Sequence, residues 1–407
     1  MKPAFAELPN KILKTMIPEY RDEFNRSFSE TRYEQLKEQL KEKAGTPALF
    51  RISESPVFLY SEFKNQLTDA CNSIVKQILE IPQEQLRKAI PADSVVPGDT
   101  DHPNFLCIDF GICRNDRGQI VPQLIELQGF PSLYAFQYAY EETVNEIFPF
   151  TASLKTTLPK EAYIQKLRDV ITGDENPENV ILLEIYPERQ KTNIDFAFTE
   201  KYLGIKTVCL TQIIREGRKL FYELDGRKIP VHRIYNRVIF DELHRIPNLK
   251  PAFDFREELE VKWVTHPNWF FKISKYILPE LQHTYIPKSY FLKDFPKDEN
   301  PEDFVLKPLF SFAGSGVNLH PTQEIIEQIP DPENFIMQCK VQYAPVFRDI
   351  NGDFSKAEIR MMYLWKDGDA LPELMGNLVR MTKVDMANVD FNKKDAIWIG
   401  SSMAFFA

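Results

Sequence analysis

The sequence has few cysteines and lacks both a long apolar run and any dense block of like charges. The five cysteines are odd in number and include no CxxC pair, which argues against a disulfide framework and for a reducing compartment. No run of about 18 apolar residues occurs, so no transmembrane helix is expected. The opening residues, MKPAFAELPNKIL, lack the apolar core of a signal peptide. These absences predict a cytoplasmic protein.

Charge and composition exclude further classes of protein. The 407 residues carry a formal net charge of −9, without a block of about five or more like charges. That balance argues against nucleic acid or an anionic membrane as the main partner. With 43% hydrophobic and 27% charged residues, the chain has the composition of a folded globular protein. Its length suits more than one domain.

Hydrophobic periodicity predicts a mostly helical region over residues 1–100. Within it, residues 61–80 place apolar side chains on one helical stripe, namely Phe63, Leu67, Cys71, Ile74, Val75 and Ile78. A loop rich in proline and aspartate follows at 91–104. Next come two predicted short strands, FLCIDFGI and IVPQLIEL, joined by the turn CRNDRG. A helix is expected from about Ser132 to Phe148.

The middle of the chain alternates strand, helix and strand. A continuous apolar strand, NVILLEIY, precedes a helix in IDFAFTEKYLGI and a second strand, KTVCL, which predicts a βαβ unit in a parallel sheet. A hairpin with an Asp-Gly turn follows, and beyond it Arg237 is expected either to face a cleft or to pair with Asp241. Residues 267–281 are predicted to form one amphipathic helix, and strands dominate from 303 onward.

A lysine followed by glycines marks the first candidate site. The stretch 303–317 is DFVLKPLFSFAGSGV, in which an apolar run ends at Lys307 and a turn with two glycines follows. A cation beside open backbone N–H groups can bind a triphosphate. No Walker spacing is present, so a plain glycine turn beside a solvated lysine is the alternative.

The elements around this stretch resemble the nucleotide-binding half of the ATP-grasp superfamily. The expected lysine helix with Lys275 lies upstream, and downstream lie the apolar strand FIMQCKVQY and two arginine-bearing strands, KAEIRMMYLW and GNLVRM. The resemblance implies ATP, with Lys275 and Lys307 on its phosphates. It also implies a loop that closes over the triphosphate and a strand that contacts adenine. The residues in those two roles would be Ser311, Gly314, Ser315, Gly316, Gln338, Lys340 and Val341.

Two arginines are the expected catalytic residues. Arg360 and Arg380 would meet the γ-phosphate or an acyl phosphate, because a planar guanidinium suits oxyanions. A surface ion pair is the alternative for each arginine, and Glu358, on the same strand face as Arg360, could simply pair with it. Lys272 competes with Lys275 for the phosphate role.

Magnesium, the second expected cofactor, needs carboxylates. Ordinary ATP-grasp chains carry them near the end, where this chain offers Asp390 and Asn392, placed very soon after the last arginine strand. Upstream, Asp109 and Glu126 lie on the two strands of the expected hairpin and can meet across it, with Gln128 two residues further on. Mg²⁺ is therefore predicted on Asp109, Glu126 and Gln128. The later pair is the rival site, and an exposed hairpin pair without metal is the alternative for the first two.

This order resembles the glutathionylspermidine synthase family, in which circular permutation moves the magnesium end of the ATP-grasp fold to the front. The family pattern is an Asp-Phe strand, a Glu-x-Asn strand, a turn with proline, an inserted α/β domain and a lysine helix, and the chain matches it over 104–407. It departs in Gln128 for asparagine and in a less charged glycine loop, and nothing resembles the family's amidase domain.

The resemblance implies an α+β fold, an ATP-grasp fold in circularly permuted order. The expected parts are a helical N-terminal region (1–100), the metal-binding part (101–158), an α/β pre-ATP-grasp-like domain (159–250) and the nucleotide-binding part (251–407). The implied function is an ATP-dependent carboxylate-amine ligase that acts through an acyl phosphate on small-molecule or peptide substrates. Two alternatives stay open: a non-catalytic ATP- or ligand-binding module, which Gln128 favours, and a kinase. The sequence identifies neither the substrates, the general base nor the oligomeric state.

Overall fold

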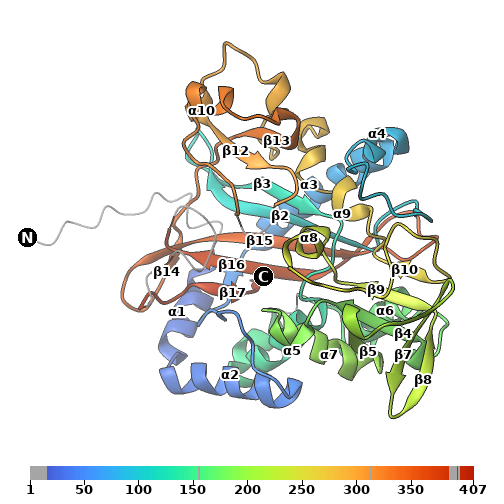
Figure 1. Ribbon diagram of the computed structural model, residues 1–407. Coiled ribbons are helices and arrows are strands. Elements are labelled where there is room, and N and C mark those ends of the chain that lie inside the picture. The colour runs from blue at the N-terminus through green and yellow to red at the C-terminus, as the bar shows by residue number, and fades with distance from the viewer. Residues whose placement is uncertain (1–15, 155, 312–313, 385–391, 393–394) are drawn as a thin grey trace, which may run out of the picture.

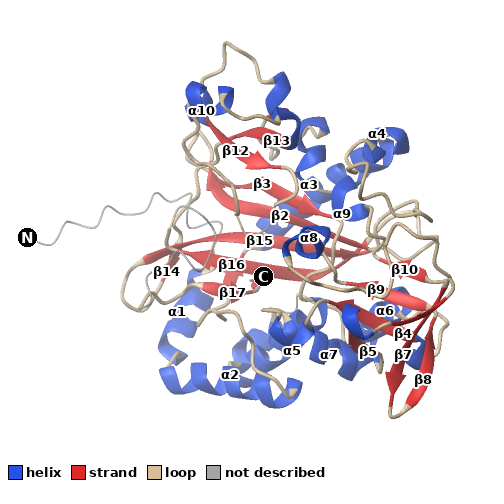
Figure 2. Cartoon of the chain, in the orientation of Figure 1, coloured by secondary structure: helices blue, strands red, loops and turns tan. Residues whose placement is uncertain are grey.

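The computed structural model describes residues 16–154, 156–311, 314–384, 392 and 395–407. These residues form a mixed α+β structure in which a large antiparallel sheet crosses the middle, with smaller sheets and helices around it (Figure 1, Figure 2). The five cysteines are free thiols. Within the described part of the chain, no helix combines the length and the apolar character needed to span a membrane.

The described part of the N-terminal region, residues 16–100, is mostly helical, as predicted for it. The helices are α1 (Pro18–Ser27), α2 (Glu30–Ala44), α3 (Ser61–Glu80) and α4 (Gln83–Arg87). All six side chains of the predicted stripe are buried on α3, which packs against the central sheet. A short strand, β1 (Val57–Leu59), pairs in parallel with β18 (Ala404–Phe406) and so joins the N-terminal region to the last strand of the chain.

The central sheet combines strands from two distant parts of the sequence. Its order is β17-β16-β15-β2-β3, every pairing is antiparallel, and β14 adds to the side of β15. The strands are β2 (Phe105–Arg114), β3 (Ile120–Gln128), β14 (Phe347–Arg348), β15 (Phe354–Leu364), β16 (Glu373–Thr382) and β17 (Gly400–Ser402). The predicted hairpin is thus confirmed as β2 and β3.

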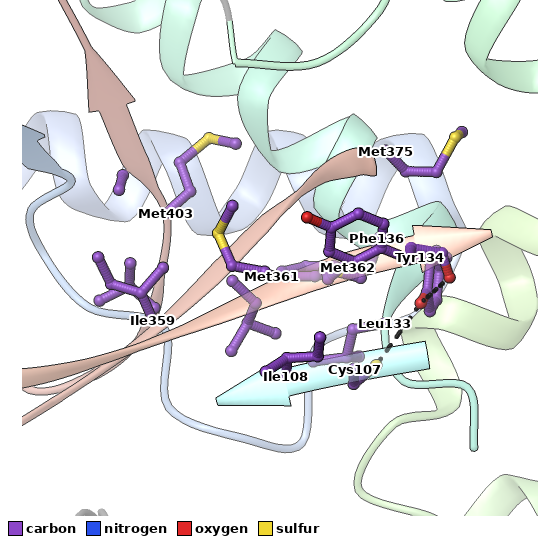
Figure 3. Close-up of a cluster of buried hydrophobic side chains, with 14 of the residues drawn as sticks. Cys107, Ile108, Leu133, Tyr134, Phe136, Ile359, Met361, Met362, Met375 and Met403 are labelled. Atoms are coloured by element: carbon purple, nitrogen blue, oxygen red, sulfur yellow. Dashed lines mark hydrogen bonds between the residues drawn. The ribbon is translucent and has the colours of Figure 1, made fainter. Parts of the chain in front are cut away.

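One face of this sheet packs into the main hydrophobic core. The helix α5 (Tyr134–Ile147) follows the β3 turn and is buried along most of its length. Figure 3 shows part of the core, where Ile108 of β2 and Met361 of β15 lie in one cluster with Tyr134 and Phe136 of α5. Because apolar side chains occupy this face, the polar side chains of the same strands gather on the other face.

The predicted βαβ unit is present as a parallel sheet with the order β10-β9-β4-β5. Its strands are β4 (Val180–Glu184), β5 (Lys206–Cys209), β9 (Arg233–Asn236) and β10 (Lys262–Val264), and its helices are α6 (Lys160–Ile171), α7 (Asn193–Leu203) and α8 (Phe240–Arg245). The predicted hairpin is confirmed within a three-stranded sheet of β6 (Ile214–Glu216), β7 (Lys219–Leu224) and β8 (Arg227–Val231). Arg237 follows β9 and is buried.

A small antiparallel sheet carries the lysine and glycine stretch. Its order is β11-β13-β12, with β11 (Ser289–Phe291), β12 (Phe304–Pro308) and β13 (Phe335–Cys339), and α10 (Gln323–Glu327) lies beyond it. In Figure 1 this sheet lies above the central one, next to β3. It has a small core of its own, formed by Leu292, Phe304, Leu306 and Met337.

The single helix predicted over 267–281 is wrong. The structure has a short helix, α9 (Trp269–Lys272), and then a separate 3-10 segment from Lys275 to Glu280. Ser274 between them is extended, and its hydroxyl accepts a hydrogen bond from the Tyr276 N–H at 3.1 Å, so it begins a new helical segment. Pro279 keeps that segment short. Lys275 therefore projects from the first turn of a 3-10 segment.

Candidate functional site

The register of the central sheet brings the predicted acidic and basic residues together. Asp109 on β2 lies directly opposite Glu126 on β3 and, on its other side, opposite Arg360 on β15. On the next pair of strands, Glu358 of β15 lies opposite Arg380 of β16. Since residues two apart on a strand share a face, Glu358 and Arg360 point to the same side. The result is a stripe of charged residues across four strands.

Asp109 is the centre of an ion-pair network within this stripe. Its two carboxylate oxygens accept hydrogen bonds from Nε and Nη2 of Arg360, each at 2.7 Å. Arg380 Nη2 donates to the same carboxylate at 2.5 Å and lies 3.0 Å from Glu358 Oε2. Glu358 therefore pairs with Arg380 and not with Arg360, contrary to the simplest expectation from the sequence. The side chain of Asp109 is only 1% exposed, so this pairing is shielded from water.

Burial and neighbouring charges shift the pKa values of Glu358 and Arg360. Burial raises the pKa of Glu358, although Arg380 and a hydrogen bond from Tyr343 oppose that rise. Burial alone would lower the pKa of Arg360, but the charge and hydrogen bonds of Asp109 raise it. Both guanidinium groups thus remain fully charged at neutral pH.

Tyr343 is a member of the site that sequence reasoning missed. Its hydroxyl donates a hydrogen bond to Oε1 of Glu358. The ring fits because Gly111, directly opposite Glu358, has no side chain: a Cβ there would lie 2.8 Å from the ring. Nothing in the sequence marks this contact, because Tyr343 follows the apolar strand β13 in a segment without a regular pattern.

Lys307 on β12 lies beside β3 of the hairpin, although 182 residues separate it from Ile125 along the chain. Its Nζ donates to the Ile125 carbonyl at 3.1 Å and to the side-chain oxygen of Gln338. Gln338 also donates to the Leu124 carbonyl at 3.2 Å, so the two side chains join the small sheet to β3. Burial lowers the pKa of Lys307 to about 8, even though Glu126 opposes that shift. At neutral pH the ammonium is thus charged but poorly solvated.

Lys275 also lies close to the carboxylate of Glu126. Its Nζ lies 3.7 Å from Glu126 Oε2 and donates to the Ser311 carbonyl at 2.8 Å. Lys272, the competing lysine, instead contacts Asp99 at 2.6 Å and Gln83. The structure therefore places Lys275 in the charged cluster and Lys272 outside it.

Four cations act on the carboxylate of Glu126. Burial alone would raise the pKa of its carboxyl, but four positive charges outweigh that effect and lower the pKa to about 2. In order of effect these charges belong to Lys275, Arg380, Arg360 and Lys307. Two predicted phosphate-binding lysines and two predicted catalytic arginines thus lie near enough to one carboxylate to stabilise its charge.

A pocket opens beside this cluster. It is narrow, with about 20 Å³ available to the centre of a water molecule, and lies between the end of β3, the segment from α9 to Lys275 and the end of β12. Its polar lining includes Glu126, Gln128, Lys275 and Ser311, and Phe130, Phe270, Ile273, Leu309 and Phe310 are among its apolar lining residues. The Ser311 hydroxyl is buried and has no hydrogen-bond partner in the part of the chain that the structure describes.

The predicted glycine loop is described only in part, because residues 312 and 313 lie outside the described residues. Gly314, Ser315 and Gly316 form a turn after which Asn318 pairs with Leu306 of β12. Gly316 has a φ of +72°, and a Cβ there would lie 2.8 Å from Pro308 Cγ, so only glycine fits this position without strain. The turn is thereby held against the strand that carries Lys307.

Two predicted adenine contacts lie apart from this cluster. The exposed Lys340 donates its Nζ to the Glu302 carbonyl, and its backbone N–H bonds the Asp303 carbonyl at 2.9 Å. Val341 follows it, beyond the end of β13. Of the predicted strand residues, only Gln338 joins the charged cluster.

The predicted magnesium ligands do not offer their oxygen atoms to a common point. Both oxygens of Asp109 accept hydrogen bonds from guanidinium groups. A divalent cation roughly 5 Å from one guanidinium would be repelled by about 7 kcal/mol at an effective dielectric constant of about 20. Gln128 donates its amide N–H to Glu126 at 2.9 Å, so its nitrogen, and not its oxygen, faces the carboxylate.

No other set of metal ligands is found among the residues that the structure describes. The rival Asp390 lies outside the described residues, and Asn392 accepts a hydrogen bond from the Lys383 backbone N–H at 2.8 Å. Among the residues that the structure describes, no group of three or more Asp, Glu, His or Cys side chains is placed to hold a metal ion. The donor set in this arrangement therefore does not fit Mg²⁺, which prefers six oxygen ligands in a near-octahedral shell.

Comparison with known proteins gives information on the fold. No protein-family model and no curated protein sequence matches the chain. Among solved structures, it is similar to a glutathione synthetase like-effector (GSS30) from Globodera pallida in its apo form, with a TM-score of 0.56 and 12% sequence identity. The similarity covers 92% of this chain and 96% of that chain. The fold is therefore mixed α+β and similar to that of this solved structure.

Proposed function

We propose that the chain is an ATP-dependent carboxylate-amine ligase of the ATP-grasp type. The observation that carries this proposal is the meeting of Lys275, Lys307, Arg360 and Arg380 around Glu126, from four elements that are far apart in sequence. A cluster of fixed cations suits the phosphates of a nucleotide. The similarity to a glutathione synthetase-like structure supports the same reaction class.

The predicted permuted order, the four predicted parts of the chain and the likeness to glutathionylspermidine synthases belong to this proposal. The permuted order is supported by the central sheet, where β2 of the hairpin pairs with β15 from the later part of the chain. A hairpin with the acidic residues thereby meets the arginine strands.

The roles of the residues follow from their positions. Lys307 and Lys275 would hold the phosphates of ATP, and the segment near Gln338 would lie along the adenine. A substrate carboxylate would attack the γ-phosphate to give an acyl phosphate and ADP, and an amine would then displace phosphate to give an amide. Arg360 and Arg380 would stabilise the charge on the transferring group. Magnesium stays a prediction from the sequence, and none of these steps depends on it.

The pocket beside Lys275 is the proposed place for a small-molecule or peptide substrate. Its apolar walls and few polar groups have the character of a small-molecule site, which a substrate would have to widen on binding. The buried Ser311 hydroxyl, which lines it without a partner among the described residues, supplies an unused donor and acceptor there.

One observation favours a second candidate, a module that binds a nucleotide or another anion without turnover. The carboxylate of Asp109 is fully paired with two arginines, whereas a working magnesium site needs open carboxylate oxygens. A kinase that transfers phosphate to a hydroxyl is the third reading, because the same cluster would serve it.

Product analysis separates these functions. The purified chain is incubated with ATP, magnesium and mixtures of amino acids, polyamines and peptides, and the products are identified by mass spectrometry. A ligase gives ADP, phosphate and an amide; a kinase gives ADP and a phosphorylated substrate. Binding of ATP without release of ADP identifies a binding module, and absence of ATP binding contradicts the ligase, the kinase and a module that binds ATP.

A further inference from the structure

We propose that this site binds a phosphate-bearing anion without a divalent cation, because two arginines fixed by Asp109 and Glu358 supply the positive charge that a metal ion would bring. Asp109 is then a positioning residue for arginines and not a metal ligand. This inference deepens the proposed function and takes from it the class of ligand, a phosphate anion. It does not depend on turnover.

The geometry of Asp109 carries the first step. Three hydrogen bonds of 2.5 to 2.7 Å from two guanidinium groups converge on its oxygens. Arg360 is bound through two nitrogens at once, the fork arrangement that fixes an arginine most firmly. With a side chain 1% exposed, Asp109 is beyond the reach of a hydrated cation. Its position on the strand therefore serves to orient arginines.

The guanidinium of Arg380 has one edge available to bind an anion. Both of its ion pairs use the same nitrogen, Nη2, toward Asp109 and Glu358. Its side chain is 29% exposed, and no described residue accepts a hydrogen bond from its Nε or Nη1. The remaining edge of a guanidinium whose position is already fixed is a good donor for an oxyanion, because little conformational entropy is lost when the anion binds.

The net charge of the cluster also favours an anion over a divalent cation. Its four cations are Lys275, Lys307, Arg360 and Arg380, and its three acids are Asp109, Glu126 and Glu358. Even with all three acids ionised, the cluster has an excess of one positive charge, 4 − 3 = +1. A further divalent cation would add to that excess, whereas an anion compensates it.

Calorimetry on the unmodified full-length chain gives the first test. Inorganic triphosphate and, separately, ATP are titrated at neutral pH in two buffers of equal ionic strength, one with magnesium and one with EDTA. The inference predicts that the affinity for triphosphate in EDTA is within about threefold of that in magnesium. A loss of more than about tenfold in EDTA overturns it, and so does absence of triphosphate binding in both buffers. A chain that binds triphosphate in EDTA but never releases ADP leaves this inference standing and refutes the ligase.

Variants test the role of the arginines. Arg380→Ala should weaken triphosphate binding about tenfold to a hundredfold in both buffers, because a charge-assisted hydrogen bond is lost. Added guanidinium ion should restore part of the affinity, and magnesium should not, a difference that a merely structural role would not produce. The matched control is Arg256→Ala, which removes a surface arginine paired with Asp254. Restoration by magnesium and not by guanidinium overturns the inference.

Asp109→Asn separates the positioning role from metal ligation. A positioning residue predicts an equal loss of triphosphate affinity in magnesium and in EDTA, whereas a metal ligand predicts a loss in magnesium only. Circular dichroism and a melting curve show whether this buried variant folds. If it does not fold, Arg380→Ala and the unmodified chain decide the question alone.

Discussion

Protonation of Lys307 should control the binding of anions by this protein. Lys307 is buried beside Glu126, Lys275 and Glu358, and burial lowers its pKa to about 8. The ammonium is therefore about 90% populated near pH 7 and about 10% populated near pH 9. If only the charged form binds, the affinity for triphosphate should fall about tenfold over this interval, which corresponds to about 1.4 kcal/mol.

The effect on stability should have the opposite sign. The unfolded chain keeps the lysine charged up to its ordinary pKa of about 10.4, while the folded chain releases the proton at about 8. The unfolded state therefore binds more protons between these values, and the contribution of Lys307 to stability rises with pH there. The lowering from 10.5 to about 8 corresponds to about 3 kcal/mol. Affinity and this contribution to stability should thus change in opposite directions.

The assay is calorimetry with inorganic triphosphate at several pH values between about 7 and about 9, in EDTA and at constant ionic strength. Inorganic triphosphate itself releases its last proton within this interval, and the added negative charge strengthens binding to cations, so a fall in affinity with rising pH comes from the protein. Lys307→Met keeps the length and apolar part of the side chain, and it should bind weakly and without this fall in affinity. Lys288→Met, at an exposed lysine before β11, is the control and should retain the slope. A flat profile in the unmodified chain, or the same slope in Lys307→Met, refutes the reasoning.

Three further changes test other parts of the site. Glu126→Gln should cost about 2 to 3 kcal/mol at neutral pH, because the lowered pKa of about 2 means that the ionised carboxylate stabilises the fold. This difference from the parent chain should vanish as pH falls from about 4.5 toward 2 in denaturant titrations, and a difference that does not depend on pH contradicts it. Tyr343→Phe should cost about 1 to 3 kcal/mol, since Glu358 loses a buried donor; unchanged melting would count against that contact. Gly316→Ala should destabilise by about 1 kcal/mol or more and weaken ATP binding, as the residue has φ of +72° beside Pro308; an unaffected variant would show that the turn is not held there.

Local patterns in the sequence predict much of the fold. The turn residues between two β-rich runs predict the hairpin of β2 and β3. Counted regularly from the turn, the register would put Asp109 opposite Ile125, and an irregularity between Asp109 and Phe110 puts it opposite Glu126 instead. The buried strand β4 and the glycine that ends α7 likewise predict the parallel unit, because both signals act over a few residues.

Other features depend on contacts between distant segments, which no local pattern encodes. Asp109 meets Arg360 only because β15, from the end of the chain, pairs with β2. From the sequence alone, a metal ion was the predicted partner of Asp109. The helix over 267–281 fails for a local reason, since the Ser274 hydroxyl caps a new segment inside a stretch with helical periodicity. Tyr343 reaches Glu358 only through the space that Gly111 leaves in another strand.

The most direct test of the proposed site is a crystal structure of the chain with a non-hydrolysable ATP analogue. The account predicts phosphate oxygens within hydrogen-bond distance of Nζ of Lys307 and Lys275 and of the Arg380 guanidinium, with Asp109 still paired to Arg360. A nucleotide bound elsewhere, or phosphates held by a metal ion on Asp109 with the arginines displaced, would contradict it.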